Sequence, residues 1–115
     1  MSQASRKELL RAYREREEIG GVYALVNEVS GKRLVLSTTN IDKAASQLDF
    51  ARTTGLCVHP LLERDWKASG GASFSLEILE RVRRGETQTE GEFTDDVRAL
   101  ESLWKERFGK DDLYR

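Results

Sequence analysis

The 115-residue sequence has one cysteine, one proline and one histidine, and it has no marked excess of charge of either sign. The single cysteine, Cys57, excludes an intramolecular disulfide and a cysteine-rich zinc site. Nineteen basic residues against twenty acidic residues give a formal net charge of −1. Dedicated nucleic-acid binders usually carry a basic excess or a clustered basic face. The overall charge therefore gives no support to nucleic-acid binding, although it leaves a local basic patch open.

Long apolar runs are also missing. No stretch approaches the ~20 apolar residues that a membrane-spanning helix needs. Residues 1–18 are charged and lack the apolar segment of a signal peptide. We therefore expect a cytoplasmic protein with no membrane partner. The length and the 38% hydrophobic content suit a single domain over residues 1–115 with one modest core.

The first part of the chain, residues 1–18, predicts an N-terminal helix. Its start carries a serine and a glutamate at capping-box spacing. Lys7, Arg11 and Arg14 fall on one face and form a candidate stripe for contacting phosphates. Acidic neighbours dilute this stripe, so an ordinary solvated face is the alternative. Gly20 and Gly21 are expected to end the helix.

Three segments predict strands. Val22–Val26 and Leu34–Leu36 are rich in strand-forming residues, and a polar turn containing Gly31 joins them into a β-hairpin. Phe74–Leu79 alternates apolar and polar residues, which is typical of a strand with one buried face. We expect the three strands to form one antiparallel sheet.

Helices are expected around this sheet. Asn40 is a candidate cap for one helix, and Pro60 fits the first turn of a short one. The polar stretch from Arg83 to Glu92 is expected to be a loop, and Thr94 is expected to cap a last helix that Gly109 ends. The predicted fold class is therefore α+β. Three aromatic side chains are expected to be mostly buried: Trp66, Trp104 and Phe108.

The predicted hairpin carries a family resemblance. Gly21-Val22-Tyr23, with Leu34-Val35-Leu36 about ten residues later, resembles the paired tripeptides of the GIY-YIG nuclease superfamily. Downstream, His59-Pro60-Leu61-Leu62, Phe74-Ser75-Leu76 and Leu100-Glu101-Ser102-Leu103-Trp104 are similar to its homing-endonuclease-like branch. The resemblance covers roughly residues 19–108. It implies a GIY-YIG-like fold with an extra N-terminal helix.

The chemistry that the resemblance implies is metal-dependent hydrolysis of a phosphodiester. In that family a tyrosine helps to activate water, an arginine stabilises phosphate charge and a glutamate holds a divalent metal. Tyr23 stands at the position of the first tyrosine, and Glu101 stands at the position of the metal-binding glutamate. These two residues are the candidate catalytic groups, and Glu101 is the candidate metal ligand.

Four other positions depart from the family pattern. The second tyrosine falls on Leu34, and the glycine that closes the second tripeptide falls on Leu36. The catalytic arginine falls on Ala44, and a histidine often found four residues later falls on Leu48. This pattern is typical of a domain that keeps its fold and has a degenerate active site.

Each candidate has an alternative interpretation. A tyrosine in a strand is often a packing residue, so Tyr23 need not act on water. A lone carboxylate binds Mg²⁺ weakly, and Glu101 has Arg98 and Lys105 as helix neighbours for an ion pair. Arg52 lies further along the second helix and is a possible substitute for the missing arginine, with a surface charge as the alternative.

His59 and Cys57 are two residues apart. One histidine cannot form a metal cluster alone, and a Cys–His nucleophilic pair needs a third orienting group. We therefore expect His59 to cap or pack a turn.

Three functions remain open at this point. The first is a catalytically inactive GIY-YIG-like domain that binds nucleic acid weakly or binds a protein. The second is an interaction or oligomerisation module without a nucleic-acid role. The third is an active endonuclease with a rebuilt site. No cofactor is expected, except Mg²⁺ where nuclease activity remains.

Overall fold

The structure, a computed structural model, describes residues 18–114 of the chain. The expected N-terminal helix, with Lys7, Arg11 and Arg14, lies outside the described residues. Within the described part, no helix has both the length and the apolar character that crossing a membrane requires.

The centre of the fold is an antiparallel sheet of three strands in the order β2-β1-β3. The strands are β1 (Ile19–Asn27), β2 (Arg33–Thr38) and β3 (Phe74–Arg83). The hairpin of β1 and β2 turns at Gly31, whose φ of 79° favours glycine. The sheet expected from the sequence, including its antiparallel pairing, is confirmed.

Strands β1 and β3 are longer than expected: β1 begins at Ile19 and β3 ends at Arg83. Gly20 and Gly21 lie inside β1, where they pair with Val82 and Arg81 of β3. They therefore do not end a helix. The strands approach so closely that a Cβ on Gly21 would lie 1.9 Å from the Glu80 carbonyl oxygen. The longer β1 explains why β3 also continues beyond the expected Phe74–Leu79.

Helix α2 (Ile41–Thr54) follows the hairpin as expected. The Asn40 side chain accepts a hydrogen bond from the Lys43 backbone N–H at 3.1 Å, which satisfies one free donor of the first turn. Gly55 ends the helix in the left-handed conformation. The capping prediction for Asn40 is confirmed.

The expected short helix at Pro60 is divided in two. Pro60–Leu62 forms a 3-10 turn, η1, and Glu63–Ser69 forms helix α3. A second 3-10 turn, η2 (Gly71–Ser73), leads into β3. The Trp66 ring stacks on Phe74 with centroids 5.2 Å apart, which anchors α3 to the start of β3.

Helix α4 (Glu90–Arg107) begins four residues before the expected cap at Thr94. The cap is Thr89, which exchanges hydrogen bonds with Glu92 in a capping box. Thr94 lies inside the first turns, where its hydroxyl donates to the Glu90 carbonyl at 2.9 Å. The prediction of Thr94 as the cap is wrong, because the capping box recruits the end of the expected loop into the helix.

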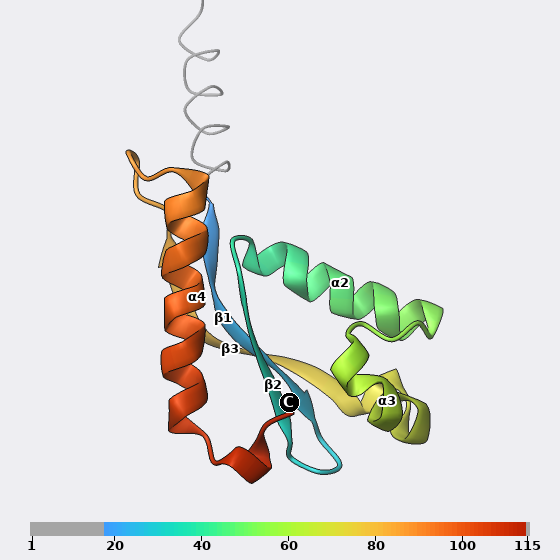
Figure 1. The fold of residues 1–115 in the computed structure, drawn as a ribbon. Coiled ribbons are helices and arrows are strands. Elements are labelled where there is room, and N and C mark those ends of the chain that lie inside the picture. Colours follow the sequence, from blue (N-terminus) through green and yellow to red (C-terminus); the bar gives the residue numbers. More distant parts are fainter. Residues whose placement is uncertain (1–17, 115) are drawn as a thin grey trace, which may run out of the picture.

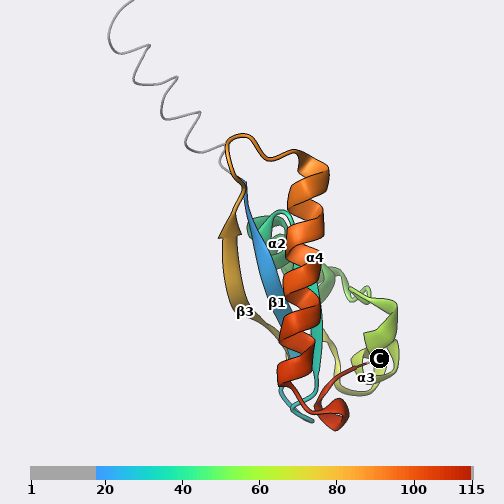
Figure 2. The ribbon, with the colours of Figure 1, turned by 60° about the vertical axis from the view of Figure 1, so that its left-hand side comes forward.

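The helices cover both faces of the sheet (Figures 1 and 2). Residues of α2 and α3 pack with Leu25 and Leu34 on one face, whereas α4 packs with Val22 and Ala24 on the other. Trp66 is buried as expected, but Trp104 and Phe108 are only partly buried. Trp104 keeps one polar contact, in which its indole Nε1–H donates to Glu80 Oε1 at 2.8 Å.

The end of the chain returns to the sheet. After a 3-10 turn, η3 (Lys110–Asp112), Leu113 forms a parallel bridge with Arg33 of β2. The Tyr114 backbone N–H donates to the Arg33 carbonyl at 2.9 Å. In Figure 1 the labelled C-terminus lies against β2. Leu113 and Tyr114 are called the C-terminal segment below.

Candidate functional site

Tyr23 lies on the central strand β1 and Glu101 lies on α4, and the charge of Glu101 acts on the Tyr23 phenol. Tyr23 is half-buried on β1, opposite Leu36 of β2, and Glu101 projects from α4. Burial, and secondly the negative charge of Glu101, raise the pKa of the Tyr23 phenol above its ordinary value of 10.0. The Glu101 charge therefore reaches Tyr23, and the tyrosine holds its proton more firmly than usual.

Both carboxylate oxygens of Glu101 have partners. The Ser37 hydroxyl donates to Oε1 at 3.1 Å, and Lys105 Nζ lies 3.1 Å from Oε2. The ion pair with Lys105 is one of the two helix neighbours considered from the sequence. The Ser37 contact was not anticipated, because it joins β2 to α4 across 64 positions. These contacts tie the carboxylate into a bridge between strand and helix.

A divalent metal does not fit this arrangement. Mg²⁺ in proteins is usually held by one or two carboxylates together with phosphate oxygens. The two carboxylate oxygens of Glu101 already contact the Lys105 ammonium group and the Ser37 hydroxyl. Between residues 18 and 114 no group of three His, Cys, Asp or Glu side chains is placed to hold a metal ion.

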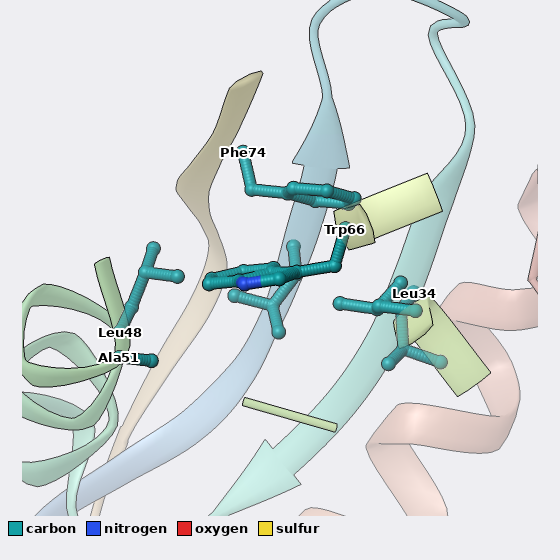
Figure 3. Packing of buried hydrophobic residues seen from close by; sticks show 7 residues of the cluster. Leu34, Leu48, Ala51, Trp66 and Phe74 are labelled. Atoms are coloured by element: carbon teal, nitrogen blue, oxygen red, sulfur yellow. The ribbon is translucent and has the colours of Figure 1, made fainter. Parts of the chain in front are cut away.

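The residues that stand at the positions of the family's other functional residues are apolar and buried. Leu34, Ala44 and Leu48 are 3%, 6% and 2% exposed. Leu34 and Leu48 belong to the cluster around Trp66 that Figure 3 shows. Side chains of this kind neither move a proton nor compensate phosphate charge.

Arg52 does not stand in for the missing arginine in this structure. It lies in the last turn of α2, and its guanidinium is 3.8 Å from Asp49 Oδ1 on the same helix. Exposed pairs of this kind contribute little to stability. The interpretation as a surface charge fits the observed pairing.

His59 and Cys57 have local roles. His59 Nδ1 accepts a hydrogen bond from the Leu61 backbone N–H at 3.1 Å and so caps η1. The Cys57 thiol donates to the His59 backbone carbonyl, with Sγ and the oxygen 3.1 Å apart. The thiol contacts the backbone instead of the imidazole, so the two side chains do not form a nucleophile–base pair. The expected capping role of His59 is confirmed.

A groove of about 760 Å³ lies beside β2 and α4. Leu34 and Leu36, the two positions that depart from the family's second tripeptide, are part of its lining. The other lining residues are Val35, His59, Leu61, Lys105, Glu106, Phe108, Lys110, Leu113 and Tyr114. The groove was not predicted from the sequence, because its walls come from three segments far apart in the chain. It is called the β2 groove below.

Comparison with solved structures identifies a similar fold. The catalytic domain of the homing endonuclease I-TevI aligns with a TM-score of 0.60 at 22% sequence identity, over 83% of this chain and 95% of that domain. A glutamate-to-alanine mutant of the catalytic domain of intron endonuclease I-TevI aligns with a TM-score of 0.62 at 19% identity, over 84% of this chain and 92% of that one. No protein-family model and no curated protein matches the chain. The α+β fold expected from the GIY-YIG resemblance is thus confirmed.

Proposed function

We propose that this chain is a non-cleaving domain on a GIY-YIG nuclease fold, and that it binds a partner protein in the β2 groove. The observation that carries the proposal is the presence of Leu34 and Leu36 in the lining of the groove. In the family pattern these positions are a tyrosine and a glycine. Here Leu36 is half-buried and adds apolar surface to the groove, whereas Leu34 is 3% exposed and belongs to the buried cluster around Trp66. Neither side chain offers the polar chemistry that a nuclease of this fold needs.

The absence of cleavage follows from the groups that hydrolysis requires. Phosphodiester hydrolysis needs an activated water and a cation that compensates the charge developing on phosphate. Ala44 supplies no such cation, and Leu34 supplies no proton acceptor. Removing a single preorganised donor typically lowers a rate by about 10²–10³. The losses concern one site and need not multiply, but each of them lowers the rate.

A protein partner suits the groove better than nucleic acid does. Leucines and Phe108 form much of the lining, whereas its cations are Lys105 and Lys110, with Glu106 beside them. Lys105 is already paired with Glu101. Nucleic-acid affinity grows with the number of phosphates that cations contact, and the formal net charge of −1 adds no general attraction.

One observation favours a second candidate, an active endonuclease with a rebuilt site. Lys105 Nζ lies 3.1 Å from Glu101 Oε2, so a cation stands beside the candidate metal ligand. In that case Lys105, and not Arg52, is the replacement for the missing arginine. The two functions separate in a cleavage assay.

The first test is cleavage of single- and double-stranded DNA and RNA by the full chain with Mg²⁺ or Mn²⁺. We expect no product above background. Glu101→Ala and Lys105→Ala serve as contamination controls, because a contaminating nuclease is insensitive to both. Cleavage by the parent chain that both substitutions abolish would establish the rebuilt endonuclease and refute the proposal.

The second test locates the partner by photo-crosslinking in cells that naturally contain the protein. A photoreactive amino acid replaces Leu61, which lines the groove and is 45% exposed. The matched control replaces Val29, which is 73% exposed and lies in the β1–β2 turn, away from the groove lining. We expect protein adducts from position 61 and not from position 29. Nucleic-acid adducts at position 61 would contradict a protein partner.

A further inference from the structure

β2 is an outer strand of the sheet, and its backbone groups alternate in direction. The Asn27 N–H donates to the Lys32 carbonyl across the hairpin, whereas the Arg33 carbonyl accepts from Tyr114 on the outer side. Alternate residues of an antiparallel strand face the same way. The N–H and C=O groups of Arg33, Val35 and Ser37 therefore face outward, and those of Leu34 and Leu36 face β1.

The C-terminal segment uses only the first part of this outer edge. It pairs with β2 at Arg33, through the bridge to Leu113 and the hydrogen bond from Tyr114. Beyond that point, the outward groups of Val35 and Ser37 have no backbone partner among residues 18–114. An edge with unpaired groups is a template for another strand. The bridge from the C-terminal segment shows that this edge accepts a backbone partner at Arg33.

The β2 groove continues from the point where the C-terminal segment pairs. Its lining contains Val35 on the edge itself, Leu61 and His59 on the η1 side, and Lys105 and Phe108 on the α4 side. A peptide strand beside Val35 would place alternate side chains toward these walls. Backbone pairing supplies affinity in such additions, and pockets for alternate side chains supply specificity.

Cations gather at the end of the groove near Tyr114. Lys110 is part of the groove lining, and Lys32 lies over the Tyr114 ring at 5.8 Å. Arg64 and Lys32 line a smaller hollow that shares Tyr114 and Leu61 with the groove. Glu106 and Asp65 are the acids of the two linings, and Asp111 and Asp112 follow Lys110 in η3 without lining the groove. Within the lining, Lys110 is the cation that an acidic residue of the partner would meet at this end.

We infer that the partner contributes an extended peptide segment that adds to the outer edge of β2 as a fourth strand, with alternating apolar residues and an acidic residue near Lys110. The inference rests on the proposed function, because it specifies how a protein partner occupies the β2 groove. The occupant is a strand of another protein. A second copy of this chain is a distinguishable outcome of the experiment below.

The experiment begins with a phage-displayed library of linear peptides selected on the full chain. The tightest binder is synthesised in three forms: unmodified, and with N-methyl groups on one or the other alternate set of amides. An added strand uses only one set for pairing, so methylation of that set should weaken binding by roughly tenfold or more, and methylation of the other set should have little effect. Equal effects of the two sets, or a selection that yields no binder, would overturn the inference.

Amide hydrogen exchange, measured by NMR with the unmodified peptide, identifies the site. The Val35 and Ser37 amides should exchange more slowly with peptide bound, while the Leu34 and Leu36 amides, already paired with β1, should change little. Protection of Val35 and Ser37 that rises with protein concentration in the absence of peptide would show that a second copy is the occupant. Protection elsewhere in the chain without these two amides would refute strand addition.

The role of the Lys110 charge is tested by a substitution with a matched control. Lys110→Glu should weaken the peptide roughly threefold or more, because an exposed attraction becomes a repulsion. Lys43→Glu, on α2 and outside the groove lining, should leave affinity within about twofold. Equal losses of affinity from both substitutions would show an effect of net charge alone, and would contradict a contact between Lys110 and the peptide. Failure of strand addition together with protein adducts at position 61 would leave the proposed function standing.

Discussion

Lys105 Nζ lies 3.1 Å from Glu101 Oε2, one helical turn away on α4. The carboxylate that resembles a metal ligand is therefore paired with an ammonium group, and its second oxygen accepts from Ser37. Glu101 thus has a structural explanation without a metal, since it joins the edge strand β2 to α4. It also acts on Tyr23 through its charge, which gives the arrangement a measurable consequence.

Glu101→Gln should lower the pKa of Tyr23. Burial and the Glu101 charge both raise the pKa of this phenol, so removing the charge leaves burial alone. Because the folded pKa lies above the unfolded value of about 10, Tyr23 contributes stability that is present below that pH and is lost as pH rises through the folded pKa. The substitution should make this contribution smaller.

Phenolate absorbance followed against pH measures the effect, with Tyr23→Phe identifying the Tyr23 transition. Lys105→Met is the opposite control, because it removes the cation paired with Glu101; the carboxylate charge is then less compensated and should raise the pKa of Tyr23 further. A Tyr23 transition that stays in place in Glu101→Gln would show that burial alone causes the shift.

The fold was predictable from the sequence where the signals are short-range. Gly31 in the hairpin turn and Asn40 before α2 each act on neighbours within a few residues, and both predictions hold. The ends of β1 and β3 were not predictable in the same way. Gly21 reads locally as a helix terminator, and only the close approach of Glu80, 59 positions away, shows that it belongs in a strand.

The site was predictable only in part for the same reason. The match of Tyr23 and Glu101 to a family pattern identified two residues that are linked by the effect of the Glu101 charge on the Tyr23 pKa. The β2 groove needs the return of Leu113 and Tyr114 to β2, and no local pattern indicates it.

Gly21→Ala should destabilise the fold strongly. Gly21 has a φ of 147°, and a Cβ there would lie 1.9 Å from the Glu80 carbonyl oxygen, a backbone atom that cannot move alone. Gly31→Ala is the matched control, because its φ is 79° and nothing lies within 4 Å of its added Cβ. We expect about 3 kcal/mol or more for Gly21→Ala and about 1 kcal/mol for Gly31→Ala in the free energy of unfolding. Urea unfolding measures both, and equal losses would show that β1 and β3 are further apart.

Thr89→Ala should cost about 1 kcal/mol of unfolding free energy, the usual loss on removing a threonine cap. Thr94→Ala is the control within the same helix, since its hydroxyl only donates back to the Glu90 carbonyl, and about 0.5 kcal/mol or less is expected. The capping-box spacing of Thr89 and Glu92 is a signal that the sequence already contains. A larger loss at Thr94 than at Thr89 would show that Thr94 caps α4, as the sequence predicts.

Tyr114→Phe should loosen the C-terminal segment without unfolding the domain. The Tyr114 hydroxyl donates to Asp65 Oδ2 at 2.6 Å and accepts from Asn27 Nδ2 at 3.0 Å, so its loss removes two hydrogen bonds. Asn27 is 2% exposed, but it keeps its contact with the Val29 N–H and a longer one to Asp65. The cost should be about 1–2 kcal/mol. In amide hydrogen exchange we expect the amide at position 114 to exchange faster and the amides of β1 to exchange at an unchanged rate.

Alkaline pH should release the same segment. Burial, and then the hydrogen bond to Asp65, raise the pKa of Tyr114, so the phenol stays neutral up to about pH 10 and beyond. Its stabilising contribution is lost as pH rises through the folded pKa, because a phenolate would face the Asp65 carboxylate. Asp65→Asn removes that charge and should lower the pKa of Tyr114, and amide exchange at Leu113 against pH measures the release in each variant. Release at the same pH in the parent and in Tyr114→Phe would show that another group holds the segment. Release in the parent alone would establish that the Tyr114 phenol controls how much of the β2 edge is covered, since the Arg33 carbonyl loses its partner when the segment leaves.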